Sequence, residues 1–259
     1  MTPSALEAAA LHLLAARRHR RPGARLPEAS RPATDEEALA VQRRVALLLD
    51  EPIGGWKCSL PTPEKMLLAP IYAATIAKAS PCAVPVHDSW ARIEPEIAFV
   101  LAHDLPRRAT PYAEADVRAA IGETRLVLEL IGSRYADPAA IPFPEMLADG
   151  ANNYGLYIGP VVPHGVDRAL DAFPIAIHAP SGAILARDGA HPDGHPLRPL
   201  TWLANWFGGN RAGWNQGLSA GQIVTTGSYA GVLDVPLATP LTVTFGALGR
   251  IEVTLIPVG

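Results

Sequence analysis

The chain has 259 residues, of which 49% are hydrophobic and 18% are charged, so a disordered protein is excluded and a large core is available. Lysine and arginine total 22 against 25 aspartate and glutamate residues, and the resulting formal charge of −3 argues against a general nucleic-acid binder. No run of about 20 apolar residues occurs, so we expect no membrane-spanning helix.

Two helices are predicted near the N-terminus. Residues 4–20 carry apolar side chains at helical spacing, and Thr34 followed by Glu37 forms a capping-box pattern that predicts a helix ending before Pro52. A basic cluster at the end of the first helix consists of Arg17, Arg18, His19, Arg20, Arg21 and Arg25. These cations could in principle contact phosphates or an anionic membrane. We prefer the interpretation that they interact with the dipole at the helix C-terminus.

The N-terminus does not have the pattern of a secretory signal, because Glu7 interrupts the apolar stretch and the positive charges follow it. Two cysteines, Cys58 and Cys82, are too few for a disulfide framework and lack zinc-site spacing. We therefore expect a protein of the reducing cytoplasm.

A glycine-led segment, residues 54–60, carries the single lysine Lys57. Two interpretations stay open for this lysine. It is either a solvated side chain, as most lysines are, or a buried one near a metal, where it would donate a proton or hold an anion.

Two strand-like runs contain carboxylates among apolar residues. Residues 92–101 include Glu94 and Glu96, which share one face of a strand, and residues 126–131 include Glu129. Ionised carboxylates buried there must be paired, protonated or bound to a cation. One interpretation is a hard-oxygen site for Mg²⁺ or Mn²⁺. The other is a salt bridge to arginine at a sheet edge, which Pro95 would favour.

The remaining patterns complete a mixed α and β chain. Residues 133–150 are rich in proline and predict a long irregular stretch of the kind that often covers a site. Hairpins are predicted around residues 173–187 and 241–255, and a helix around residues 200–207. His191 and His195 lie in a Pro/Gly-rich segment, which does not favour a metal pair. Residues 218–228 predict a strand that ends in small residues, where a ligand can approach the backbone.

Several separated segments together resemble the fumarylacetoacetate hydrolase superfamily, specifically the branch of 2-oxopent-4-enoate hydratases and 2-oxo-3-hexenedioate decarboxylases. They occur in the order of that family and span residues 40–230. The segments are Ala40-Val41-Gln42, Gly55-Trp56-Lys57, Ile93-Glu94-Pro95-Glu96-Ile97-Ala98, Glu129 with Ser133-Arg134, Ala148-Asp149, Trp202-Leu203-Ala204-Asn205 and residues 218–228.

The resemblance implies an α+β fold built on a mixed β-roll. We expect an N-terminal helical region at residues 1–60 and a catalytic β-roll at residues 61–259. It also implies that Mg²⁺ or Mn²⁺ is held by Glu94, Glu96 and Glu129 and that Lys57 is catalytic. Further expectations are Asp149 in a catalytic or supporting role, with a turn aspartate as the alternative, and substrate contacts from Ser133, Arg134, Thr226 and Ser228.

The implied activity is that of a metal-dependent lyase of aromatic-compound catabolism, acting on a small 2-oxo acid through an enolate. Hydration of 2-oxopent-4-enoate is the first expectation. Alternatives are 2-oxo-3-hexenedioate decarboxylation, acylpyruvate hydrolysis, or a non-catalytic, metal-bound partner subunit. We also expect a homo-oligomer. Two departures from the family pattern bear on the reaction: Gly132 replaces an aspartate, and an acid before a Gly-rich turn is missing near residues 69–72.

Overall fold

The computed structural model describes residues 1–209, 213–214 and 216–258. The helices of this part are α1 Pro3–His19, α2 Asp35–Leu49, α3 Glu114–Ala120, α4 Phe143–Ala148 and α5 Leu197–Gly208. The strands are β1 Ile53–Cys58, β2 Leu68–Tyr72, β3 Ile76–Ala77, β4 Cys82–Val84, β5 Trp90–Leu101, β6 Ile121–Ile131, β7 Asn153–Val161, β8 Ala172–Ala179, β9 Gly182–Ala190, β10 Ile223–Ser228, β11 Leu233–Pro236, β12 Pro240–Phe245 and β13 Gly249–Pro257.

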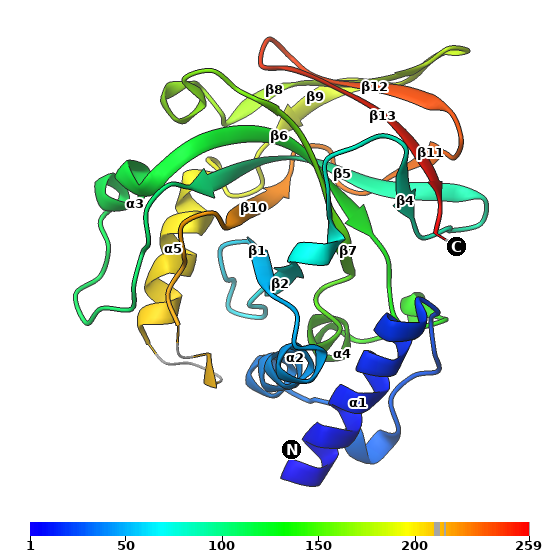
Figure 1. Ribbon diagram of the computed structural model, residues 1–259, viewed down its shortest axis with the longest axis vertical. Helices are drawn as coiled ribbons and strands as arrows, with labels where there is room; N and C mark the ends of the chain where they lie inside the picture. Colours follow the sequence, from blue (N-terminus) through cyan, green and yellow to red (C-terminus); the bar gives the residue numbers. More distant parts are fainter. Residues whose placement is uncertain (210–212, 215, 259) are drawn as a thin grey trace.

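The strands form two sheets. The larger has the order β2-β1-β10-β5-β6-β7-β3, with β11 paired to β5, and the smaller has the order β4-β13-β12-β8-β9. The larger sheet is mixed, because β1 and β10 are parallel while β5 and β6 are antiparallel. The smaller sheet lies across the larger one, and α1, α2 and α4 gather at the opposite end of the molecule (Figure 1). The expected α+β class is confirmed.

The two N-terminal helices begin and end where local sequence requires. The Thr34 side chain accepts a hydrogen bond from the Glu37 amide at 3.3 Å, so α2 starts at its predicted cap. Its apolar side faces α1, where Leu13 and Leu39 are completely buried. A fully buried leucine contributes roughly 2 kcal/mol. The division of the chain at residue 60 stays a prediction; β1 precedes that boundary and pairs with β2 and β10.

The stretch 133–150 differs from the expected irregular loop, because it contains α4. The side chain of Gln42, which is buried on α2, donates hydrogen bonds to the carbonyls of Leu147 at 2.5 Å and Leu68 at 3.1 Å. These bonds satisfy a carbonyl at the end of α4 and fix the short helix against α2 and β2. Tertiary contacts have therefore ordered a segment in which three prolines predict only loop.

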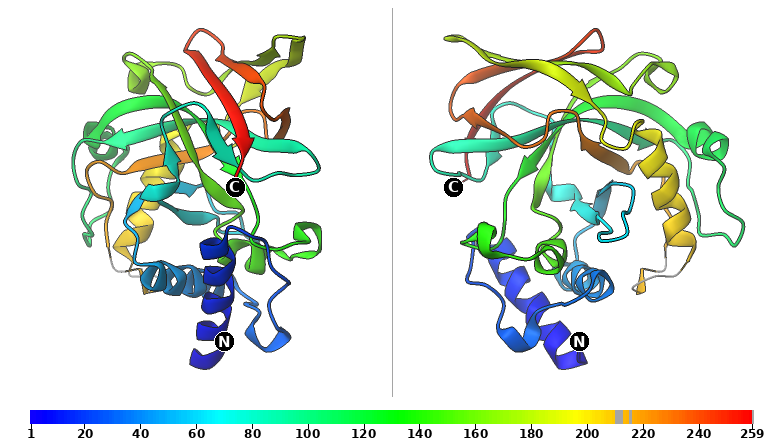
Figure 2. Two further views of the ribbon diagram at one scale, coloured as in Figure 1. Left: turned by 45° about the vertical axis from the view of Figure 1, so that its right-hand side comes forward. Right: turned by 180° about the vertical axis from the view of Figure 1, so that it is seen from behind.

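One face of the larger sheet carries the candidate site. Glu94 of β5 is directly opposite Glu129 of β6 in the strand register, and Glu96 follows on the same face. Farther along this face lies a small apolar cluster of Ile71, Ala98, Val127, Leu156 and Ile223. The carboxylates therefore lie beside buried apolar side chains. The two views of Figure 2 show how the smaller sheet crosses the larger one. Among the described helices, none is both long and apolar enough to cross a membrane.

Candidate active site and metal centre

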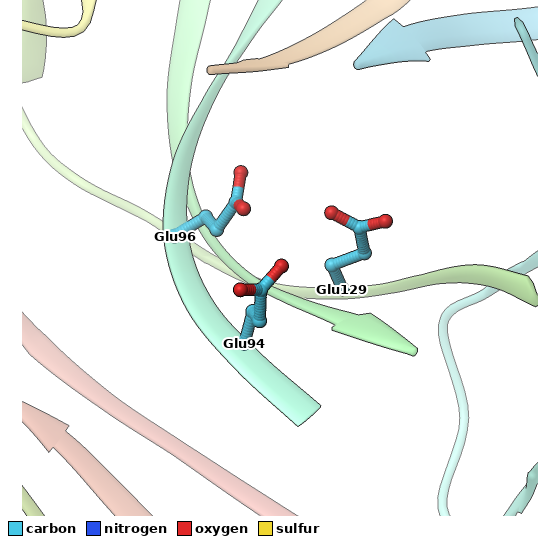
Figure 3. Close-up of side chains that lie close together, drawn as sticks. All are labelled: Glu94, Glu96 and Glu129. Carbon is cyan, nitrogen blue, oxygen red and sulfur yellow. The ribbon is translucent and has the colours of Figure 1, made fainter. Parts of the chain in front are cut away.

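The three carboxylates predicted from the sequence converge. Each of Glu94, Glu96 and Glu129 offers an oxygen that lies within 4.8 Å of the corresponding oxygens of the other two. Glu94 and Glu96 extend from β5 and Glu129 from β6, and all three point into one space (Figure 3). Glu129 is completely buried and Glu96 is 2% exposed, whereas Glu94 is only partly buried. The group is therefore reached from the side of Glu94.

Lys57 joins this group through the packing of its neighbour. The Trp56 ring packs against Phe207 of α5 with ring centroids 4.9 Å apart, so the alternation of β1 directs Lys57 to the opposite face. There the Lys57 Nζ donates to Glu129 Oε1 at 2.6 Å and to the Ala151 carbonyl at 3.3 Å. The lysine is 8% exposed, which decides against the solvated side chain that the sequence left open.

Glu129 has one oxygen bound and one oxygen free. Oε1 accepts from Lys57 and also from Asn153 Nδ2 at 2.9 Å. Oε2 is buried and has no hydrogen-bond partner among the described residues. An unpaired buried carboxylate oxygen is costly. It therefore marks a position where a cation fits.

Glu96 is held by the turn that ends β10. Its Oε2 accepts from the Thr225 hydroxyl and from the Gly227 amide, the latter at 3.0 Å. Gly227 has φ +130°, and a Cβ at this position would lie 2.9 Å from the Pro192 ring. Glycine is required there for both reasons. Thr225 and Asn153 were not among the predicted site residues; the small residues at the end of β10 were the only signal for the first.

The acids shift one another's ionisation. Burial, and then the charge of Glu129, raise the pKa of Glu94 to about 7. Burial, and then the charges of Glu129 and Glu94, raise the pKa of Glu96 to about 8. Burial lowers the pKa of Lys57, but the attraction of the three carboxylates outweighs this and leaves the pKa raised. The lysine is thus protonated near neutral pH, and one positive charge faces three acids.

The raised carboxyl pKa values predict a pH-dependent stability in the absence of divalent ions. The folded chain holds protons on Glu94 and Glu96 that the unfolded chain has lost above its ordinary pKa of about 4.5, so stability falls as pH rises from about 5 to about 8. Urea unfolding in chelator across this range measures the loss. Saturating Mg²⁺ is expected to reverse it, because the ion replaces the protons. A Glu96→Gln variant should show a shallower slope, and an unchanged slope in that variant would contradict this explanation.

These residues fit a divalent cation. The donor set consists of carboxylate oxygens, which Mg²⁺, Mn²⁺ and Ca²⁺ prefer. The charge of the three acids exceeds that of Lys57, and Glu129 Oε2 lacks a partner. In the described part of the chain, no arginine forms an ion pair with Glu94, Glu96 or Glu129. The alternative interpretation, a salt bridge to arginine, is therefore not supported.

Arg134 and Asp149 are paired with each other. Arg134 Nε donates to Asp149 Oδ1 at 2.5 Å, its backbone amide donates to Asp149 Oδ2 at 2.9 Å, and Nη2 donates to the Asp149 carbonyl at 2.6 Å. Nη1 donates to the Asn153 carbonyl at 2.7 Å. Both side chains are buried. The pair connects β6, α4 and β7, and its bonds fix the backbone of Asn153, whose side chain holds Glu129.

Breaking this pair is expected to cost stability. Replacing Arg134 with methionine leaves Asp149 buried without its main partner, and we expect the free energy of unfolding to fall by about 3–5 kcal/mol. Urea denaturation measures this change. Adding Asp149→Leu to Arg134→Met should restore part of the stability, since no unpaired charge remains. A double variant no more stable than the single one would contradict a buried ion pair as the cause.

The three remaining residues that were predicted to contact substrate each form a hydrogen bond within the chain. Thr226 follows Thr225 on β10 and lies 3.3 Å from His191 Nε2 through its hydroxyl. Ser228 is opposite Glu96 in register, and its hydroxyl donates to the Gly231 carbonyl at 3.2 Å. The Ser133 hydroxyl accepts from the Tyr135 amide at 3.1 Å. The roles of these three residues, and those of Arg134 and Asp149 toward a substrate, stay predictions.

His191 is buried and takes part in the turn beside Glu96. Its Nδ1 accepts from the Asp193 amide at 3.1 Å, so Nε2 carries the proton and donates to Thr226. Burial, and then the charge of His195, lower the pKa of His191 to about 4, so it is neutral near pH 7. These hydrogen bonds of His191 are known only from the structure, because the sequence pattern gave no signal for them.

Comparison with known proteins gives both sequence and fold relationships. No protein-family model matches the chain. The chain is 30% identical over 166 residues to a 2-keto-4-pentenoate hydratase from Burkholderia vietnamiensis, a match that covers 63% of this chain and 60% of the relative. The chain thus spans less than two thirds of the length of the curated relatives that it matches.

Solved structures share the fold over nearly the whole chain. A 4-oxalocrotonate decarboxylase from Pseudomonas putida G7, solved with calcium and acetate, superposes with a TM-score of 0.77 at 21% identity and covers 99% of both chains. The same enzyme has been solved with magnesium and adipate. A Yersinia pestis protein named as a member of the fumarylacetoacetate hydrolase family superposes with a TM-score of 0.55 at 17% identity, over 80% of this chain and 94% of that one.

The fold and the sequence similarity agree with each other and with the motifs that carry the carboxylates. The β-roll expected from the resemblance is confirmed by the shared fold. The sequence similarity is to hydratases, over about 60% of their length. The chain is similar in sequence to 2-keto-4-pentenoate hydratases, and it shares its fold with a 4-oxalocrotonate decarboxylase and with a protein named as a member of the fumarylacetoacetate hydrolase family.

Proposed function

We propose that the protein is a divalent-metal-dependent lyase that hydrates 2-oxopent-4-enoate, reacting as its 2-hydroxypenta-2,4-dienoate tautomer. The observation that carries this proposal is the convergence of Glu94, Glu96 and Glu129 within 4.8 Å, with the Lys57 ammonium 2.6 Å from Glu129. The name of the Burkholderia relative, a 2-keto-4-pentenoate hydratase, supports the same substrate class.

Glu94, Glu96 and Glu129 would hold Mg²⁺ or Mn²⁺. When bound, the ion supplies positive charge that stabilises the negative charge developing on the oxygens of a 2-oxo acid. The calcium and magnesium complexes of the Pseudomonas decarboxylase support a divalent ion in this fold. The Thr225 hydroxyl and the Gly227 amide orient Glu96, while Asn153 orients Glu129.

Lys57 would hold and move the proton. Its ammonium group is protonated near neutral pH and is fixed by Glu129 and the Ala151 carbonyl, so Nζ is positioned before substrate binds. A positioned acid of this kind donates to a carbon that has gained negative charge and accepts the proton in the reverse direction. We propose that Thr226 and Ser228 contact the substrate carboxylate, together with Ser133, and that Asp149 acts through Arg134.

The charge at the far end of the substrate separates the hydratase from the decarboxylase. A 2-oxo-3-hexenedioate substrate carries a second carboxylate, and Arg134 is the cation predicted to receive it. The Arg134 side chain already donates from Nε, Nη1 and Nη2 to Asp149 and Asn153. Because these donors already bind acceptors within the protein, they favour the substrate with one carboxylate. The decarboxylase remains the second candidate because of the shared fold of the Pseudomonas enzyme.

A direct assay distinguishes the candidates. Loss of the diene absorbance of 2-hydroxypenta-2,4-dienoate with added Mg²⁺ is the expected result, with no CO₂ released from 2-oxo-3-hexenedioate. CO₂ release without hydration would support the decarboxylase, and hydrolysis of an acylpyruvate alone would support the third activity of the superfamily. Saturable Mg²⁺ binding without turnover of any of the three would instead support a non-catalytic partner subunit.

The cellular setting is part of the same proposal. We place the protein in the cytoplasm, in the breakdown of aromatic compounds, and as a homo-oligomer. The two cysteines, Cys58 and Cys82, are free and buried, as expected in a reducing compartment. Light scattering coupled to size-exclusion chromatography measures the oligomeric state directly.

A further inference from the structure

A cavity of about 490 Å³ lies on the other side of β6 from the carboxylates. Leu130 lines it, whereas the adjacent Glu129 faces the carboxylate group, so the strand separates the two places. The end of α1 and the turn after it form one wall, and β3, β4 and Tyr154 of β7 form another. The cavity therefore lies apart from the three carboxylates, although Ser133 and Arg134, which were predicted as substrate contacts, line it.

The lining of this cavity is strongly basic. It includes Arg17, Arg18, Arg20 and Arg21 from the end of α1, and Arg134 from the loop after β6. Glu51 is the one acid among the described lining residues, and the Arg134 charge is offset by Asp149. At least three positive charges thus remain without a compensating acid in the lining. The cluster that the sequence suggested as a favourable helix end is here gathered around a hollow.

One buried donor in the cavity lacks an acceptor, and two exposed arginines beside it have no partner in the described chain. Arg17 Nε is buried and has no hydrogen-bond partner within the described chain. The side chains of Arg20 and Arg21 form no hydrogen bond or ion pair with the described residues. An unpaired guanidinium donor that is buried costs free energy until an acceptor arrives.

The arrangement is more than a solvated helix end. Arg17 is held over the Tyr72 ring at 5.4 Å and is anchored through Nη2 to the Asp149 carbonyl, so its position is fixed. Burial, followed by the charge of Arg134, lowers the pKa of Arg17 to about 10. A helix end that only satisfied its dipole would leave all of its arginines in water.

We propose that this cavity binds a small anion with two or more negative charges, of the phosphorylated or polycarboxylate class. Guanidinium groups form paired, charge-assisted hydrogen bonds with phosphate and carboxylate oxygens. The cavity is concave and large enough to admit pyrophosphate or citrate, and its shape does not suit a flat membrane surface or a nucleic-acid backbone. The binding site requires neither Mg²⁺ nor the proposed substrate.

The test is isothermal titration of the full chain with pyrophosphate and, separately, with citrate, in buffer without divalent ions. Saturable binding of at least one of them is expected. The double variant Arg20→Glu/Arg21→Glu should weaken it about tenfold or more, because two guanidinium donors are lost and two repulsive charges are gained. These side chains are exposed and unpaired, so the variant should keep the thermal unfolding temperature of the parent chain.

Arg187 on β9 provides the matched control. It is exposed, lies outside the cavity, and Arg187→Glu makes the same kind of charge change. Binding retained in Arg187→Glu and weakened in the double variant supports the cavity as the site. Binding of pyrophosphate alone or citrate alone identifies the phosphorylated or the polycarboxylate source. No saturable binding of either, or equal weakening by Arg187→Glu, overturns the proposal.

Discussion

Replacing Glu129 with glutamine is expected to lower kcat/KM for the proposed substrate by about 10³-fold or more. The variant keeps an amide oxygen that accepts from Lys57 and Asn153, so the hydrogen bonds of Oε1 persist while the charge is lost. The affinity for Mg²⁺ should fall about 10²-fold or more, since one of three anionic ligands is removed. Turnover and isothermal titration with Mg²⁺ measure the two effects.

The matched control is Glu123→Gln, which removes a carboxylate from the same face of the same strand. Glu123 is paired with Arg125 at 2.7 Å and lies at the other end of β6, away from the three acids. This control should keep both turnover and Mg²⁺ affinity within about twofold of the parent chain. If Glu129→Gln kept its Mg²⁺ affinity, Glu129 would not be a metal ligand.

Replacing Lys57 with methionine is expected to separate proton transfer from metal binding. Methionine fills a similar volume in the buried position but carries no proton, so kcat should fall by about 10²–10⁴-fold. Removal of the ammonium also removes a cation that competes for the same carboxylates. The affinity for Mg²⁺ should therefore stay equal or increase.

Lys78→Met is the control for this variant, because Lys78 is exposed and directly follows β3, the edge strand of the larger sheet. Its turnover should match that of the parent chain. Intact turnover in Lys57→Met would remove the lysine from the mechanism. Loss of Mg²⁺ binding together with turnover would contradict the expected separation, because the lost metal would by itself account for the lost activity.

The meeting of the three carboxylates could be predicted, since strand alternation and the cost of burying charge act locally. Alternation puts Glu94 and Glu96 on one face, and the structure pairs Glu94 directly with Glu129. The capping of α2 by Thr34 was predictable for a similar reason, because the residues that satisfy the first amides are neighbours in sequence.

The neighbours of these residues could not be predicted, because they come from distant segments. Asn153 reaches Glu129 only through the register of β7 against β6, and Thr225 reaches Glu96 only through the pairing of β10 with β5. Sequence patterns do not fix such registers across long connections. The helix α4 also depends on a partner, the side chain of Gln42, that lies about a hundred residues earlier.

Arg134 illustrates the limit for charged residues. Its position in the family pattern suggested a cation for the substrate, while its buried bonds to Asp149 and Asn153 could be known only from the structure. An arginine pattern in sequence gives the charge but not the acid that neutralises it. The same limit applies to Arg17, whose burial over Tyr72 no local pattern indicates.

The central claim is that the acids of β5 and β6 form one binding site for a divalent ion. Anomalous diffraction from crystals soaked with Mn²⁺ tests it most directly. The predicted result is a single strong peak at a distance of about 2.0–2.3 Å from an oxygen of each of Glu94, Glu96 and Glu129. A peak elsewhere, with the Lys57 ammonium alone neutralising these carboxylates, would contradict the account.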